Sequence, residues 1–417
     1  MSGPLTNWAG NITFSTDRIS RCCSVEELQE LVASSDRLRV LGTGHSFNPI
    51  ADTTGTLVSV ADLPADVRID GAAQTVSVPA GLRYGELTPR LQADGVALHN
   101  LGSLPHISIA GACATGTHGS GDGNRTLASA VSSMEFVGAD GGLVRLDRTD
   151  PDFSGAVVSL GALGVMVRLT LDLVPAYEIS QVVYDGLPVS RLGTDFDAIL
   201  GSAYSVSAFT DWQDPQARIW RKMLAQEPLQ VEPEWHGATL ADGPRHPVPG
   251  MPAEFCTQQG GVPGPWHERL PHFRLEFTPS NGEELQSEYF LPRRTAAAAI
   301  DALRGLGERM AGLLQIGEIR TIAAEDLWLS PSEGRDTVAF HFTWVRDYPA
   351  VLPVVAAIEE ALLPLGARPH WGKVFAADAG TLRECYPRTG DFIDLIARYD
   401  PAGKFRNDYL DRNLPQR

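Results

Sequence analysis

The chain has 417 residues, of which 43% are hydrophobic and 20% charged, so we expect a folded protein of two or three domains. Thirty-four basic against 51 acidic residues give a net charge of −17, which argues against nucleic acids and anionic membranes as partners. The five cysteines form no C-x-x-C pair, and neither a secretory leader nor an apolar run of membrane-spanning length is found. We therefore expect a reduced, cytoplasmic, monomeric protein with no metal site.

The first 175 residues alternate short strands and helices. Ser24 and Glu27 form a capping box, which predicts a helix up to residue 34. Residues 103–121 contain many glycines and show little regular pattern. The other elements that we expect are strands at 37–41, 56–60 and 165–174, hairpins at 67–78 and 130–146, and helices at 84–93 and 152–160.

The pattern changes after Pro175. Residues 226–272 are rich in proline and glycine and are expected to form long loops. Further elements are strands at 274–277, 288–291, 316–323 and 338–345, and helices at 295–314, 350–363 and 381–399. This order predicts an antiparallel sheet with helices on one face, and therefore an α+β fold.

Two glycine-rich segments are candidates for ligand binding. Residues 42–48 (Gly-Thr-Gly-His-Ser-Phe-Asn) follow a predicted strand, and such a turn exposes backbone N–H groups that suit a pyrophosphate. Phe47 and Asn48 stand where a Rossmann fingerprint and a nucleophile elbow would need glycine, which argues against both. Taken alone, His45 would more simply be a turn residue. By themselves, residues 103–121 would be a flexible linker, although their isoleucines and histidines are not typical of linkers.

Together with four further motifs, these segments resemble the vanillyl-alcohol oxidase superfamily, and within it the alditol oxidase (xylitol oxidase) branch. The resemblance implies a two-domain fold in which residues 1–175 and the C-terminal segment 379–417 bind FAD, while residues 176–378 form a substrate-binding cap. The motifs lie in the same order as in that branch, at 42–48, 103–108, 114–121, 159–165, 318–321 (Glu-Ile-Arg-Thr), 341–344 (His-Phe-Thr-Trp) and 369–375 (Pro-His-Trp-Gly-Lys-Val-Phe).

The resemblance implies FAD that is bound covalently through the ring of His45. Gly164 and Val165 match a turn that meets the adenine half of FAD. Cys113 lies in a loop where a related branch carries a second, cysteinyl bond, but the surrounding motif is of the single-link type. The other cofactor-binding positions carried over are Val40, Leu41, Gly42, Thr43, Gly44, Ser46, Ser103, Ser108, Gly111, Thr115, Gly116, Thr117 and His118.

The second half of the chain contains the candidate substrate site. Glu318 and Arg320 lie on one face of a predicted strand, because strand side chains alternate. Without the resemblance they would be a surface ion pair of little consequence. With it, they belong to a polar cluster that faces the flavin. The catalytic candidates are Arg320, Lys373 and Glu318, and the substrate-binding candidates are Ser103, Glu318, Arg320, Thr343 and Lys373.

These roles follow from the expected reaction. Arg320 and Lys373 would stabilise a developing alkoxide, while Glu318, Ser103 and Thr343 would bind neighbouring hydroxyls. The resemblance also implies that a small residue at Gly102 leaves the flavin edge open to oxygen, which favours an oxidase over a dehydrogenase. We therefore expect oxidation of the terminal primary hydroxyl of an alditol, such as xylitol or sorbitol, to the aldose, with O2 reduced to H2O2. The alternatives are an aldonolactone oxidase or dehydrogenase of the same superfamily, and a non-catalytic flavin- or carbohydrate-binding protein.

Overall fold

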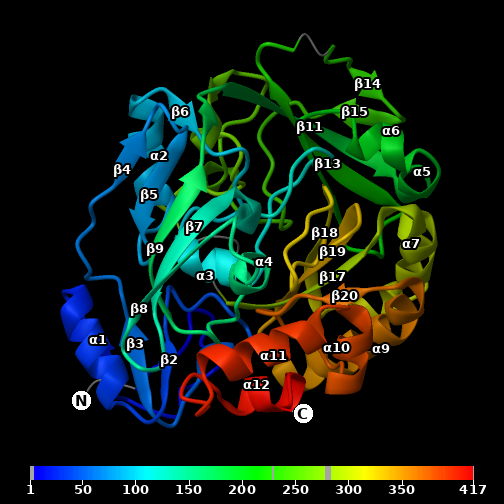
Figure 1. Cartoon of the computed structure of the whole chain (residues 1–417). Coiled ribbons are helices and arrows are strands. Elements are labelled where there is room, and N and C mark those ends of the chain that lie inside the picture. Colours follow the sequence, from blue (N-terminus) through cyan, green and yellow to red (C-terminus); the bar gives the residue numbers. More distant parts are fainter. Residues whose placement is uncertain (1–3, 228–229, 278–282, 417) are drawn as a thin grey trace.

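The computed structural model describes residues 4–227, 230–277 and 283–416, and these build four β-sheets (Figure 1). The N-terminal part contributes a three-stranded parallel sheet, a five-stranded antiparallel sheet and a two-stranded pair. In sheet order, the strands are β1 (Ile19–Arg21), β3 (Thr56–Ser59) and β2 (Leu38–Val40); β4 (Arg68–Asp70), β5 (Thr75–Pro79), β9 (Val165–Asp172), β7 (Val131–Val137) and β8 (Leu143–Asp147); and β10 (Val174–Pro175) with β6 (Val96–Ala97).

Two helices of the N-terminal part follow their sequence signals closely. The predicted capping box begins α1 (Val25–Ser34), because Ser24 accepts a hydrogen bond from the backbone of Glu27, whose carboxylate accepts one from the backbone of Cys23. Helix α2 (Tyr84–Ala93) is also where we expected it. Buried and half-buried residues alternate along β9, so one of its faces packs in the core.

A ten-stranded sheet dominates the second half of the chain, and all of its neighbouring strands are antiparallel. Helices α5 (Val189–Thr194), α6 (Phe196–Leu200), α7 (Ala296–Arg304) and α9 (Tyr348–Leu362) gather on one face of it (Figure 1). This arrangement confirms the α+β prediction. The strands in sheet order are β14 (Glu234–Trp235), β15 (Ala238–Leu240), β11 (Glu178–Pro188), β13 (Gln216–Leu224), β12 (Ser205–Thr210), β18 (Leu314–Ile322), β19 (Thr337–Val345), β17 (Glu284–Pro292) and β20 (Arg368–Pro369), with β16 (Gly264–Pro265) beside β11.

Two long helices that we predicted are in fact broken. The helix expected at 295–314 ends with α7 at Arg304 and is followed by the short α8 (Gly307–Met310), because Gly305 and Gly307 are poor helix formers at the break. The tail expected at 381–399 divides into α10 (Ala379–Cys385) and α11 (Thr389–Tyr399). Pro387 lies in the break and has no backbone N–H to continue a helix.

Three shorter predictions were also wrong. Residues 274–277 are a turn rather than a strand, next to an isolated bridge between Phe273 and Cys256. The helix expected at 152–160 is only α4 (Phe153–Ala156), since Leu160 and Gly161 have positive φ angles that no helix accommodates. Residues 103–121 contain the unexpected helix α3 (Ile109–Ala114).

The C-terminal helices return to the N-terminal part of the molecule. Phe392 of α11 and Leu410 of α12 (Asp408–Asn413) share a hydrophobic core with Leu87 of α2 and Ile109 of α3. The division of the chain at residues 175 and 378 stays a prediction. The stretch Tyr348–Leu365, which contains α9, is long and apolar enough to cross a membrane, but core helices of soluble proteins meet the same criteria.

Candidate active site

A cavity of about 520 Å³ lies between the glycine-rich segments of the N-terminal part and strands β17 to β19 of the large sheet. Every residue that the sequence pointed to as cofactor-binding lines this cavity, except Gly116 and Val165. Gly116 packs against Pro331 instead, and Val165 is fully buried in a hydrophobic core. All the substrate-site candidates line the same cavity. The fold thus brings together residues up to position 164 and residues from position 318 onward, which are more than 150 positions apart in sequence.

The glycine turn shapes one end of the cavity. Gly44 has a φ of +72°, a conformation that glycine adopts without strain. A Cβ on Gly42 would lie 2.7 Å from the Ser108 hydroxyl oxygen, so a side chain there would fill the space between the two glycine-rich segments. The absence of side chains therefore leaves a cradle in which backbone can approach a ligand closely.

His45 lies at this end of the cavity with its polar atoms unused. Its ring stacks on Trp8 at a centroid distance of 4.7 Å and an interplanar angle of 18°. Within the described part of the chain, neither buried ring nitrogen has a hydrogen-bond partner. Burial, aided by nearby His106, lowers the pKa of His45 to about 4, so the imidazole is neutral at pH 7. A neutral ring with unpaired nitrogens fits a bond to a ligand in the cavity.

Cys113 does not have the properties of a second attachment point. Its sulfur is buried, 3.8 Å from the Tyr84 hydroxyl. Burial raises the pKa of this thiol to about 12. Because the thiolate is the nucleophilic form, the cysteine is unreactive at neutral pH. This chemistry agrees with the single-link motif in the sequence.

Three adjacent strands place ionisable residues in one row at the other end of the cavity. The strand register pairs Glu288 of β17 with His341 of β19, and His341 with Glu318 of β18. Directly paired residues project from the same face of a sheet, so the three side chains lie side by side. The sequence motifs included His341 and Glu318, but Glu288 was not recognised. Its only signal was a charged residue at the start of the strand expected at 288–291.

Glu288 binds both cations of the site and is only 1% exposed. Its Oε1 accepts a hydrogen bond from Arg320 Nη2 at 2.7 Å, and its Oε2 accepts one from Lys373 Nζ at 2.7 Å. Oε1 also lies 3.1 Å from His118 Nε2. Burial by itself would raise the pKa of Glu288, but Lys373, His118 and Arg320 hold it well below its usual range. The carboxylate is therefore charged and fully paired.

Glu318 and Arg320 are neighbours, as their spacing predicted, but the surface ion pair that we weighed is wrong. Arg320 Nε lies 3.6 Å from Glu318 Oε1, and the two side chains are only 7% and 6% exposed. Arg320 also donates from Nη1 to the Ser103 hydroxyl at 3.5 Å and to the His118 carbonyl at 3.4 Å. These contacts tie the substrate-site candidates to the second glycine-rich segment.

Lys373 is connected to Thr343 through the ring of His341. Its Nζ lies 2.8 Å from His341 Nδ1, and His341 Nε2 lies 3.1 Å from Thr343 Oγ1. Burial and the charge of Lys373 lower the pKa of His341 to about 4, so the ring is neutral at pH 7. The ammonium can only donate, so Nδ1 accepts and the ring proton faces Thr343.

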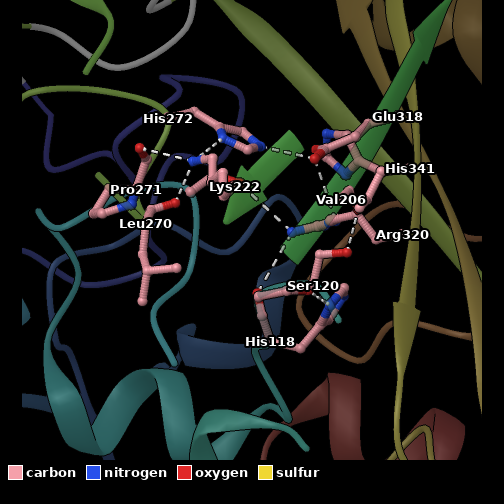
Figure 2. Close-up of polar contacts among 12 residues, drawn as sticks. His118, Ser120, Val206, Lys222, Leu270, Pro271, His272, Glu318, Arg320 and His341 are labelled. Carbon is pink, nitrogen blue, oxygen red and sulfur yellow. Dashed lines mark hydrogen bonds and ion pairs between the residues drawn. The ribbon is translucent and has the colours of Figure 1, made fainter. Parts of the chain in front are cut away.

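A second polar chain, which the sequence did not reveal, ends at Glu318 (Figure 2). His272 Nε2 lies 2.8 Å from Glu318 Oε1, and His272 Nδ1 lies 3.1 Å from Lys222 Nζ. Lys222 comes from β13, and His272 comes from the long segment between β16 and β17. Burial would raise the pKa of Glu318, yet Arg320 and His272 lower it, so this carboxylate is also charged.

Comparison with known proteins agrees with this geometry. The FAD binding domain family matches residues 17–147, and the D-arabinono-1,4-lactone oxidase family matches residues 281–413. The chain is 53% identical to the alditol oxidase of Streptomyces sp. (strain IKD472 / FERM P-14339) over 98% of this chain and 99% of that protein. It is 29% identical to the L-gulono-1,4-lactone dehydrogenase of Mycobacterium tuberculosis, over 99% and 100% of the two chains.

The fold is also found among solved structures. The crystal structure of cholesterol oxidase from B. sterolicum superposes with a TM-score of 0.79, covering 99% of this chain and 96% of that one. At 15% identity this likeness shows the fold alone. Because a 53% identical relative spans nearly the whole length, the chain belongs to the alditol oxidase family of the vanillyl-alcohol oxidase superfamily of FAD-linked oxidases.

Proposed function

We propose that this protein oxidises the terminal primary hydroxyl of an alditol, such as xylitol or sorbitol, to the aldose, with O2 reduced to H2O2. The observation that carries the proposal is the single cavity that joins the His45 turn to the cations held by Glu288. FAD would supply the acceptor for the hydride that leaves the alcohol carbon. The glycine cradle and the unpaired nitrogens of His45 suit a covalently bound FAD.

The residues around Glu288 would bind and orient the substrate. Arg320 and Lys373 are fixed cations that can stabilise negative charge on the reacting oxygen. Glu318 offers an acceptor, while Ser103 and Thr343 offer hydroxyls that both donate and accept. An uncharged polyol presents a row of hydroxyls, which such mixed donors and acceptors match. Two buried carboxylates balance the two cations, so the site has no excess charge that would favour a charged substrate.

Gly102 supports oxygen as the acceptor. It lines the cavity next to Ser103, and a Cβ at this position would meet its nearest neighbours, the His118 carbonyl oxygen and the Thr117 methyl carbon, at 3.6 Å. A small residue therefore leaves open space beside the proposed flavin site.

The test is a peroxide-coupled assay of the purified yellow protein with xylitol, sorbitol, glycerol and aldonolactones. Peroxide release with xylitol and sorbitol is expected. The 29% identical lactone dehydrogenase and the matching lactone oxidase family make an aldonolactone the second candidate substrate. Turnover of aldonolactones but not of alditols, or turnover with an artificial dye but not with O2, would overturn the proposal in favour of that alternative.

The covalent bond has a test of its own. Acid-precipitated wild-type protein should remain yellow, and the proteolytic peptide that contains His45 should carry the mass of the flavin. His45→Ala should give a colourless precipitate while still binding FAD without a covalent bond, since the glycine cradle is unchanged. Colourless wild-type precipitate from flavin-loaded protein would contradict the proposed attachment.

We also propose that the protein works as a cytoplasmic monomer without a membrane partner. The large hydrophobic side chains exposed among the described residues are scattered, which supports a free surface rather than an interface: Ile19, Leu143, Val231, Val262 and Tyr348. Size-exclusion chromatography with light scattering tests the oligomeric state, and a dimer mass would contradict it.

A further inference from the structure

Three buried ionisable side chains form a line that ends in the cavity wall (Figure 2). Lys222 is 1% exposed and lies behind His272, which in turn lies behind Glu318. His272 and Glu318 line the cavity. The proposed reaction assigns no role to Lys222 or His272, although burying a lysine and a histidine together is costly. This cost indicates that the two buried residues have a function.

Three carbonyl oxygens and one ring nitrogen surround the lysine nitrogen at hydrogen-bonding distance. Lys222 Nζ donates to the backbone carbonyls of Arg269, Leu270 and Pro271 at 2.9, 2.5 and 3.1 Å. Its fourth partner is His272 Nδ1, at 3.1 Å. Burial lowers the pKa of Lys222 to about 7, an effect that the charge of Glu318 opposes. Carbonyls can only accept, so the lysine donates to them, while the direction of its bond to His272 depends on where the ring carries its proton.

The ring proton of His272 lies on the side that faces Glu318. Burial and Lys222 lower the pKa of His272 to about 4, so the imidazole is neutral at pH 7 and carries one proton. The Glu318 carboxylate is charged and can only accept, so this proton resides on Nε2 and is donated to Oε1, which leaves Nδ1 as an acceptor for Lys222. A lysine, a neutral ring and a carboxylate therefore form a chain with a single hydrogen-bond direction.

The segment that carries His272 is held rigidly. The backbone N–H of His272 donates to the Ser103 carbonyl at 3.1 Å, and Thr257 Oγ1 donates to the Pro271 carbonyl at 2.6 Å. The ring edges of Trp220 and Phe209 flank the imidazole at centroid distances of 5.1 and 5.5 Å. These contacts leave the imidazole one orientation.

Among the described residues, the contacts of the Glu318 carboxylate, from His272 and from Arg320, both use Oε1. We propose that Lys222 and His272 are positioning residues, which hold Glu318 through the Nε2–H···Oε1 hydrogen bond so that its Oε2 accepts a hydrogen bond from a substrate hydroxyl. The inference rests on the proposed polyol oxidation and names the residues that tune its selectivity.

Two substitutions of His272 distinguish the proposed positioning of Glu318 from a role of His272 in anchoring its own loop. The amide nitrogen of His272→Gln can replace Nε2 as donor to Glu318, whereas His272→Asn can replace only Nδ1 as the acceptor for Lys222. We expect kcat/KM for xylitol to fall about 10- to 100-fold in His272→Asn and to be largely retained in His272→Gln. The ratio of kcat/KM for xylitol to that for 1-butanol, which has no second hydroxyl, should fall only in His272→Asn.

The matched control is His246→Gln. His246 is another buried histidine, from the loop between β15 and β16, and its Nδ1 accepts from the backbone of Val248 at 3.0 Å, outside the chain described above. Its substitution should leave kcat/KM unchanged. If His272→Asn matches the wild type, or if it slows both substrates equally, the positioning role is overturned.

A measurement without turnover separates this inference from the proposed function. Nitrogen-15 NMR of labelled histidines, with His272 assigned from the spectrum of His272→Gln, should place the His272 proton on Nε2 at pH 7. A proton on Nδ1 would overturn the part assigned to Lys222, whatever the substrate is. Wild-type protein that gives no peroxide with xylitol would instead overturn the proposed function and leave this result standing.

Discussion

Glu288 is the residue on which the charge balance of the site depends. It pairs with Arg320 through one oxygen and with Lys373 through the other, and all three side chains are largely or fully buried. A buried cation without its partner keeps its desolvation cost and loses its compensation. The orientation of both cations toward the cavity therefore depends on one carboxylate.

Replacing Glu288 by glutamine should destabilise the protein strongly. Because two buried cations would lose their counter-charge, we expect Glu288→Gln to lower the free energy of unfolding by about 3–5 kcal/mol. Denaturant unfolding at pH 7 measures it. Glu86→Gln is the matched control, since Glu86 pairs with Arg83 at 2.9 Å on the surface, and such pairs contribute about 1 kcal/mol or less. Equal effects of the two substitutions would contradict the role of Glu288.

Local motifs predicted the residues that lie in short runs, such as 42–48 and 318–321, but not those that act alone. Glu288 is 32 residues from Arg320 and 85 from Lys373 in sequence, so no local spacing connects them. Lys222 likewise stands by itself in a strand, 50 residues from His272. Only the register of the large sheet and the path of the long loop bring these side chains together.

At the scale of elements, the strands nearest the cavity were the ones that could be predicted. Strand β19 alternates because Phe340 and Phe342 pack against the helices while His341 and Thr343 face the cavity. Residues 178–224, which form β11, β13 and β12, carried no strand prediction. All six residues of β12 are buried, so both faces of this strand are covered and the contrast that reveals a strand is lost.

The spacing of two residues on strand β18 predicts how the site selects its substrate. Glu318 and Arg320 are two residues apart, and their backbones are about 6–7 Å apart, a spacing that suits neighbouring hydroxyls of one extended chain. A site built to bind a hydroxyl rejects a substrate that lacks it, since its buried polar groups go unpaired. Each missing hydroxyl should therefore cost about 1–3 kcal/mol of transition-state binding.

The measurement is kcat/KM along xylitol, glycerol, 1,2-propanediol and 1-butanol, which should decline steeply in this order. Ile316 precedes Glu318 by two residues on β18 and also lines the cavity, but it offers no polar group, so Ile316→Val serves as a control that should keep the slope of the series. A flat series would mean that the pocket does not bind individual hydroxyls, and Glu318 and Arg320 would then have only a structural role.

On the scale of the whole molecule, the cavity needs both halves of the chain. The glycine segments come from the first 120 residues, the ionisable row comes from three strands between residues 284 and 345, and Lys373 follows the last strand. Asn48 connects the two directly, because its amide donates to the carbonyls of Trp371 and Lys373 at 2.8 Å. Sequence motifs could place each group, but their common cavity follows only from the packing of the two parts.

Buried histidines make the whole protein sensitive to acid. Burial lowers the pKa of nine of the ten histidines, and that of His272 and His341 to about 4. Between pH 6.5 and 4 the unfolded chain therefore binds protons that the folded chain does not, so the stability falls as the pH falls. Glu288 and Glu318, whose pKa is lowered, act in the same direction below about pH 4.5, while buried Glu325 and Glu359, whose pKa burial raises, partly oppose it.

We expect the free energy of unfolding to decrease steadily from pH 7 to pH 5, with His272 and His341 each contributing about 2 kcal/mol of the loss at pH 5. Denaturant titrations at pH 7.0, 6.0, 5.5 and 5.0 measure the slope. His246→Gln removes one buried histidine outside the proposed site and should make the slope shallower, because one proton fewer is taken up on unfolding. A free energy of unfolding that stays constant or rises on acidification to pH 5 would contradict this origin of acid sensitivity.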